Sequence, residues 1–282
     1  MVLEALTNPV QAEQRPWQMF FLGILFTLVA IIFSLWIFQG QASLVMVFLI
    51  VMAALPIIYN TIKLEEQKDE EGYSEKHLLK EHAKALSVFM FLFLGITIAI
   101  ATVYVFVPTP YLDIAFGVQN QAIMDVNSAV SGRVVSPSVL PVIFFNNVKV
   151  LIFCVLFAFV FGAGAIFILT WNASVIGVAL GNFIRVKLAE LAGASGFTSV
   201  SHYFSAFSLG VLRYATHGVF EILAYFIAGL AGGLISVSII RNHFGTKKFE
   251  KVLFDSSGLL LVSFGVLFMA GLIEVYVTPL FF

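Results

Sequence analysis

The stretch from Arg213 to Arg241 places the strongest constraint on how this chain can fold. Its middle is apolar and long enough for a helix to cross a lipid bilayer. The same helix would carry His217 and Glu221, which are four residues apart and therefore lie on one face. Ionisable side chains are costly in hydrocarbon, so they usually face a bundle interior or a cavity. The stretch therefore predicts a membrane helix with a polar face that other helices must cover.

The composition extends this prediction to the whole chain. Of the 282 residues, 60% are hydrophobic and only 11% are charged, with a mean hydropathy of +1.01. A soluble domain is typically about half apolar and a quarter charged. We therefore predict an all-α fold, a polytopic transmembrane helical bundle in the cell membrane, with residues 1–282 as one integral membrane domain. The net charge of −1 gives no reason to expect a nucleic-acid partner, and the lipid bilayer is the expected environment.

Apolar runs of span length predict the membrane helices. They cover residues 17–38, 43–62, 85–107, 148–170, 172–192, the middle of 213–241, and 257–278. The run 172–192 is weakened by Arg185, Lys187 and Glu190, so the sequence leaves the count at six to seven spans. Residues 197–212 are rich in serine and aromatic residues, which predicts an additional interfacial or re-entrant helix.

Two connections within residues 1–145 are long enough to have structure of their own. Residues 63–84 are densely charged, which favours a solvated loop between two helices that protrude from the membrane. Residues 108–145 show apolar side chains at helical spacing, which predicts an amphipathic helix on the membrane surface. That helix could be a lid over the bundle or a floating connector, and the sequence does not decide between them.

The distribution of Lys and Arg predicts the orientation of the chain. With a cytoplasmic N-terminus and a spanning 172–192, ten Lys and Arg residues lie inside and five outside. If 172–192 does not span, the numbers are nine and six. The first arrangement is favoured, and it places the C-terminus outside.

Several polar residues fall in or beside the predicted spans. Asn147, with Asn146 before it, precedes one span, and Asn172 lies at the expected junction of two, so capping of helix N-termini is the simplest interpretation. Alternatively, an intramembrane polar cluster could form if the helices bring these side chains together. Its members would be Asn147, Asn172, His217, Glu221 and Glu274.

Such a cluster could be a hydrogen-bonded structural group, an ion or proton pathway, or a metal or catalytic site. His217 and Glu221 alone are too few ligands for zinc, which needs three or four. The sequence also lacks the nucleophile, zinc-protease and phosphate-loop motifs. We therefore expect no cofactor, no resident metal and no catalytic residues, with an intramembrane metalloenzyme as the least favoured alternative.

Glycines at regular spacing predict close helix packing. Gly177 and Gly181, and likewise Gly229 and Gly233, form small-xxx-small steps, and Gly162 lies inside the predicted span 148–170. These steps can serve contacts within the chain or between two copies. We therefore predict a homo-oligomer, most simply a dimer.

The order of these motifs resembles the stage II sporulation protein M family. The residues concerned are Asn146-Asn147, Asn172-Ala-Ser-x-x-Gly177, His217-Gly218-x-x-Glu221, Ala228-Gly229-x-x-Gly232-Gly233 and the closing Glu274-Val-Tyr-Val-Thr-Pro279, while Asn8 to Trp17 is similar to the start of archaeal members. The resemblance is densest over 146–279, which would form the family core. It implies a multi-pass helical protein without established enzymatic activity. The family's namesake anchors peptidoglycan hydrolases to the membrane during engulfment.

Two functions follow as hypotheses. The first is a non-catalytic membrane scaffold or anchor that organises other membrane or envelope proteins, as the resemblance implies. The alternative is an ion- or proton-coupled transporter or channel that uses the buried Asn/His/Glu cluster. A water-accessible cavity that reaches His217 and Glu221 would favour the alternative.

Overall fold

The computed structural model describes residues 8–70, 75–130 and 139–280, and within these ranges it contains helices and no strands. The helices are α2 (Pro9–Gln14), α3 (Gln18–Ile37), α4 (Ala42–Glu70), α5 (Glu75–Phe106), α6 (Thr109–Val130), α7 (Val139–Phe161), α8 (Ala165–Ser195), α9 (Val200–Ile240) and α10 (Lys247–Leu272). A 3₁₀ turn (Gln39–Gln41) joins α3 to α4, and a π-helical turn (Ile273–Val277) and a second 3₁₀ turn (Thr278–Leu280) follow α10. Seven of the helices are long and apolar enough to cross a membrane. The prediction of an all-α polytopic membrane bundle is confirmed.

Helices are the expected form because a bilayer offers no water to satisfy backbone polar groups. On α3, small residues such as Gly23 and Ala30 are buried against the bundle, whereas Phe21, Ile32 and Trp36 point outward. Large outward-facing apolar side chains suit a lipid environment. Small residues therefore pack α3 against the bundle on one face, and large apolar residues face the lipid on the other.

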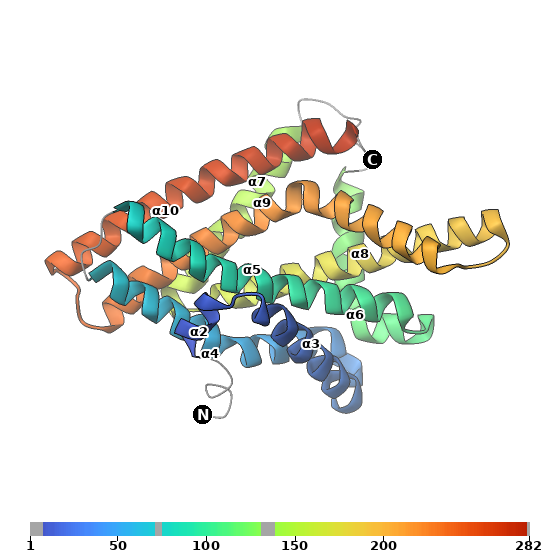
Figure 1. The fold of residues 1–282 in the computed structure, drawn as a ribbon, viewed down its shortest axis with the longest axis horizontal. Coiled ribbons are helices and arrows are strands. Elements are labelled where there is room, and N and C mark those ends of the chain that lie inside the picture. The colour runs from blue at the N-terminus through green and yellow to red at the C-terminus, as the bar shows by residue number, and fades with distance from the viewer. Residues whose placement is uncertain (1–7, 71–74, 131–138, 281–282) are drawn as a thin grey trace.

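Helix α9 lies in the middle of the bundle and packs along α7, α8 and α10, while α5 packs against α3 and α8 (Figure 1).

Two sets of contacts mark the two ends of the bundle. At one end, which we call the charged end, Lys68 pairs with Glu13 and Arg241 pairs with Glu66. At the other, the hairpin end, the turn between α8 and α9 lies beside the end of α5, where Phe106 stacks on Tyr203.

Contacts of α9 with neighbouring elements show how far along the bundle each part of α9 lies. The turn between α7 and α8 lies level with Gly233, whose added Cβ would stand 2.9 Å from the carbonyl oxygen of Gly162. The end of α5 lies level with Tyr203. Gly233 and Tyr203 are about 45 Å apart along the helix at 1.5 Å per residue, which is close to the full thickness of a bilayer. Glu221 falls between them and therefore lies in the membrane interior.

The predicted boundary between the spans 148–170 and 172–192 is wrong. Helix α7 ends at Phe161, and Gly162 adopts a left-handed conformation with φ of 70° before α8 begins at Ala165. Glycine tolerates this conformation because it has no Cβ. As a result Asn172 lies inside α8, and Asn146 and Asn147 lie inside α7, so the interpretation of these asparagines as N-caps is also wrong.

Residues 197–212 do not form a separate interfacial or re-entrant helix. Ser199 and His202 form a capping box at the start of α9, which then continues for 41 residues to Ile240. A helix of this length measures about 60 Å. The prediction failed because the serines in this segment are compatible with a helix that continues beyond the membrane. Figure 1 shows the hairpin of α8 and α9, in yellow and orange, extending past the neighbouring helices.

The segment 63–84 is not a solvated loop over the part that the structure describes. Helix α4 continues to Glu70 and α5 begins at Glu75, with residues 71–74 outside the described ranges. Glu65, Glu66 and His82 are buried in this segment. The charged residues are therefore part of the packed bundle at its charged end.

The predicted amphipathic helix within 108–145 corresponds to α6, and residues 131–138 lie outside the described ranges. Phe116 and Gln119 of α6 are fully buried. The Gln119 side-chain amide donates to the carbonyl oxygen of Ser43 at 3.2 Å and to the hydroxyl of Ser174 at 3.3 Å. These contacts fix α6 to α4 and α8, so α6 is not a floating connector.

Candidate functional site

Three of the predicted polar residues meet in the membrane interior. The Asn147 amide of α7 donates to Glu221 Oε1 of α9 at 2.5 Å. Glu274, in the π-helical turn after α10, lies close enough to Glu221 for the two carboxyl groups to interact electrostatically. The arrangement is therefore an amide and two carboxyl groups that come together from α7, α9 and the turn after α10.

His217 lies one turn before Glu221 on α9 and contacts the C-terminal segment. Its Nδ1 is 3.3 Å from the Thr278 hydroxyl, which also donates to the carbonyl oxygen of Ile273 at 3.2 Å. Because that hydroxyl proton is engaged with Ile273, the Thr278 oxygen can accept from the imidazole. His217 and Glu221 thus hold the last turns of the chain against α9.

Asn172 does not join this group through any hydrogen bond that the structure describes. Its amide donates to the carbonyl oxygen of Ile168, four residues earlier in α8, at 2.7 Å. The five predicted positions are therefore divided. Asn147, Glu221 and Glu274 meet, His217 lies beside them, and Asn172 bonds to its own helix.

A second polar cluster, at the charged end, was missed from the sequence. Lys68 of α4 contacts Glu65 at 2.6 Å, Glu13 of α2 at 2.6 Å and Glu81 of α5 at 3.0 Å. His82 Nδ1 stands 2.7 Å from the other oxygen of Glu65. We call these five residues the Lys68 cluster. It ties three helices together through one ammonium group.

A further ion pair extends the charged end to α9. Glu66 is fully buried, and its carboxylate lies 2.6 Å from the Arg241 guanidinium and 3.5 Å from His243. For the Lys68 cluster and the Glu66–Arg241 pair, the local sequence indicated only that Glu65 and Lys68, three residues apart on a helix, could interact. No sequence signal linked Glu13 or Arg241 to residues so distant in the chain.

Burial raises the pKa of Glu13 from its usual 4.5 to about 7, against the opposing effect of Lys68. A raised carboxyl pKa means that the folded protein holds this proton more tightly than the unfolded chain does. The contribution of Glu13 to stability is therefore fully present below about pH 4.5 and is lost as pH rises to about 7.

Replacement of Glu13 by Gln should remove this pH dependence. As pH rises from 4.5 to 8, the free energy of unfolding of the variant should increase by about 2–3 kcal/mol relative to that of wild type, since each pKa unit corresponds to 1.36 kcal/mol. Thermal unfolding in detergent across this range measures the difference. A constant difference between the two proteins at all pH values would contradict the prediction.

The predicted packing glycines lie against neighbouring helices of the same chain. An added Cβ on Gly177 would stand 2.9 Å from Ile100, one on Gly181 2.7 Å from Tyr104, and one on Gly229 2.9 Å from Ala165. Gly162 lies in the turn between α7 and α8, where it faces Tyr59 and Gly233, and not inside a span. Because these faces are occupied within one chain, the steps at Gly177 and Gly229 are not available for the predicted dimer contact.

An apolar groove lies at the hairpin end. It has a volume of about 340 Å³ and is lined by the end of α5, by Ile184 of α8, and by Val200, Tyr203, Phe204 and Phe207 of α9. We call it the hairpin groove. Val200 is 87% exposed and Phe204 77% exposed, so much of its lining is open on the surface of the chain.

Within the described ranges, no group of three or more His, Cys, Asp or Glu side chains is placed to hold a metal ion. Cys154 is buried in α7. In this structure the two polar clusters hold helices together through hydrogen bonds and ion pairs.

Comparison with known families gives one match. The family described as stage II sporulation protein M matches residues 87–279, which is more than half of the chain and includes the interior group of Asn147, Glu221 and Glu274. The family is not known as an enzyme family. No curated protein and no solved structure matches the chain. With its seven apolar helices and this match, the chain is a multi-pass membrane protein that belongs to the stage II sporulation protein M family.

Proposed function

We propose that this protein is a non-catalytic membrane scaffold that holds a second membrane or envelope protein in the hairpin groove. The observation that carries the proposal is the exposed apolar face that Val200, Phe204 and Phe207 form along the first turns of α9. Family membership supports a membrane protein, and the assignment of the partner site is our own.

The position of Arg185 supports this location. Its guanidinium donates to the carbonyl oxygens of Tyr104 and Val107 at 3.2 and 3.0 Å, at the end of α5. A charged side chain bonded to helix-terminal carbonyls belongs near the membrane surface. Helix α8 continues for ten residues beyond Arg185 to Ser195, which is about 15 Å. The hairpin tip therefore projects beyond the hydrocarbon.

The tip has two different sides. Lys187 and Glu190 form an exposed ion pair at 2.7 Å, as expected for a surface in water. Val200 and Phe204 are one helical turn apart on α9 and are largely exposed, and Phe197 before them is 65% exposed. Exposed apolar patches on surfaces in water usually mark protein interaction sites. An apolar or aromatic helix of a partner protein is the ligand that suits this groove.

The experiment is site-specific photocrosslinking in native membranes. A photoreactive residue at Phe204 should give one discrete covalent adduct with a partner protein. The same residue at Leu261, which is 76% exposed on α10, provides the lipid-facing control. Phe207→Ser should reduce the Phe204 adduct several-fold, because it removes an aromatic wall of the groove.

Adducts with lipid alone, or equal adducts at Phe204 and Leu261, would contradict the proposal. A self-adduct would instead identify the partner as a second copy of the chain, which would support the predicted dimer at a site other than the glycine steps.

Proton-coupled transport is the second candidate, favoured by the interior carboxyl pair of Glu221 and Glu274 with Asn147. Purified protein in liposomes with a pH-sensitive dye distinguishes the two functions. Proton flux that is lost in Glu221→Gln would show that scaffolding is not the whole function.

A further inference from the structure

Helix α2 is held against the bundle by one small face. Of its six residues, Ala12 and Glu13 are the buried ones, whereas Gln11 and Gln14 are exposed. The buried face lies on α4 and α5. An isolated helix of this length is not stable in water. The position of α2 therefore depends on these two buried side chains.

Glu13 makes the larger part of this contact. Ala12 buries a single methyl group, so its hydrophobic contribution is small. Glu13 Oε2 lies 2.6 Å from Lys68 Nζ, whereas its Oε1 is buried and has no hydrogen-bond partner among the described residues. A buried acceptor without a donor is costly, and more so when it carries a charge. The strength with which α2 docks therefore depends on whether this carboxyl group is ionised.

The charges around Glu13 do not balance. The titratable groups that face it from α4 and α5 are the other members of the Lys68 cluster, with Lys84 paired to Glu81 at the edge, namely Glu65, Lys68, Glu81, His82 and Lys84. With every carboxyl group ionised and His82 neutral, three negative charges meet two ammonium groups. One proton on the cluster removes the excess negative charge.

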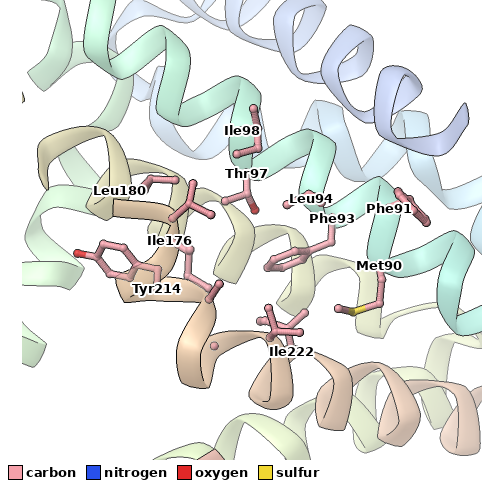
Figure 2. Close-up of a pocket in the computed structure, with 14 residues that line it drawn as sticks. Met90, Phe91, Phe93, Leu94, Thr97, Ile98, Ile176, Leu180, Tyr214 and Ile222 are labelled. Carbon is pink, nitrogen blue, oxygen red and sulfur yellow. The ribbon is translucent and has the colours of Figure 1, made fainter. Parts of the chain in front are cut away.

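Ionisable side chains on α5 are confined to its first turns. After Lys84 the helix carries no carboxyl, imidazole or ammonium group up to its end at Phe106. Met90, Phe93 and Thr97 instead line an apolar groove between α5, α8 and α9 (Figure 2). Any response of α5 to pH near neutrality therefore arises at the charged end, where α2 docks.

Helix α2 can move without α3. The turn of Arg15, Pro16 and Trp17 separates the two helices, and Arg15 leaves the helical conformation with φ of −135° and ψ of 61°. Pro16 has no N–H group, so the hydrogen bonding of α2 cannot continue through it. Glu13 is also the one member of the Lys68 cluster that α2 carries. A swing of α2 about this turn would therefore take Glu13 out of the cluster and leave the other members in place.

Burial raises the pKa of Glu13 from 4.5 to about 7, with Lys68 opposing and Glu65 adding to the effect. On a released α2 the carboxyl group is solvated and has its ordinary pKa. A raised pKa in the docked state means that docking is fully favoured below about pH 4.5 and weakens as pH rises to about 7. Over this interval the docking equilibrium falls by up to about 300-fold, since each pH unit corresponds to a factor of ten.

From this geometry we infer that α2 is a pH-sensitive latch over the Lys68 cluster. The latch is closed when Glu13 holds a proton and opens when Glu13 ionises. Opening exposes Lys68 and Glu65, whose side chains are 16% and 0% exposed in the closed form. The latch does not depend on the proposed scaffold function, because the hairpin groove lies at the opposite end of the bundle.

Distances between spin labels in the full chain test the latch. Cysteines at Gln11 on α2 and at Lys80 on α5, both exposed positions, carry the labels, and the native Cys154 is buried. Pulsed electron paramagnetic resonance at pH 5 and pH 8 measures their separation in detergent, after labelling at a single pH. We expect one short distance at pH 5. The ratio of short to long distances should fall at least tenfold at pH 8.

Two glutamine variants identify the group that titrates. Glu13→Gln should keep the short distance at both pH values, because the amide has no proton to lose. Glu81→Gln is the matched control, since it also removes a carboxylate from Lys68 but lies on α5, and it should still open as pH rises.

A single short distance in wild type at both pH values would overturn the inference. Opening of Glu13→Gln to the same extent as wild type would also overturn it, because another group would then control α2. Glu13→Gln that is open at both pH values would show that the ion pair with Lys68 closes α2, which is the reverse of the inferred latch.

Discussion

Replacement of Lys68 by Met should lower the stability of this protein by about 3–5 kcal/mol, because it leaves several buried carboxylates without their shared cation. Lys68 is the ammonium group that Glu13, Glu65 and Glu81 share, and Glu81 also pairs with Lys84 at 2.5 Å. Met keeps most of the side-chain volume and helix propensity, so the loss reflects charge. Thermal unfolding in detergent at pH 8, where carboxylates are ionised, measures the effect.

The control for this variant is Lys187→Met. Lys187 pairs with Glu190 on the exposed hairpin tip, and exposed pairs contribute about 0–1 kcal/mol. Addition of Glu65→Gln to Lys68→Met should restore part of the lost stability, since it removes the most deeply buried charge. Equal effects of Lys68→Met and Lys187→Met would show that the Lys68 cluster does not hold the helices together.

Replacement of Gly95 by Leu should separate α3 from α5. An added Cβ at Gly95 would overlap the carbonyl group of Phe20, and one at Gly23 would stand 2.5 Å from the carbonyl oxygen of Leu92. Backbone atoms cannot move aside as a flexible side chain can. Even one extra methylene in a packed core costs about 1–3 kcal/mol, so we expect a loss of at least about 3 kcal/mol for leucine.

Thermal unfolding again gives the size of this effect, and increased alkylation of a cysteine introduced at Ala30, which is buried on α3, reports the separation. Gly258→Leu is the matched control, because an added Cβ there meets no atom within 4 Å. Indistinguishable melting of the two leucine variants would mean that the close approach at Gly95 is not needed for stability.

Hydropathy was sufficient to predict the spans but not the position of every boundary. Each of the seven spanning helices corresponds to an apolar run, because the bilayer fixes both length and polarity. The break at Gly162 lay inside one such run. Glycine is common in membrane helices, so its presence in an apolar run gives no sign that the helix ends there.

Some of the polar groups could be predicted from the sequence and others could not. Glu221 and Asn147 stand out in sequence because a charge or an amide in an apolar helix needs a partner. The Lys68 cluster does not stand out, because dense charge in 63–84 is typical of a solvated segment. Its burial depends on α2 and α5 packing around Lys68, and those contacts join residues far apart in the chain.

Glycine spacing was informative only for pairs. Gly177 with Gly181 and Gly229 with Gly233 follow a recognisable step, and each approaches a neighbouring helix. Gly95 makes the closest approach of those described and has no glycine four residues away. An added Cβ at Gly218 would meet no atom within 4 Å, and the local sequence does not distinguish this glycine from those that pack against a neighbouring helix.

Helix α9 contains no proline and runs without a break from the hairpin tip to the contact between Arg241 and Glu66. A rod of about 60 Å transmits a tilt from one side of the bilayer to the other. Because α9 is unbroken, a tilt of the hairpin tip would also displace Arg241 relative to the buried Glu66 carboxylate at the charged end.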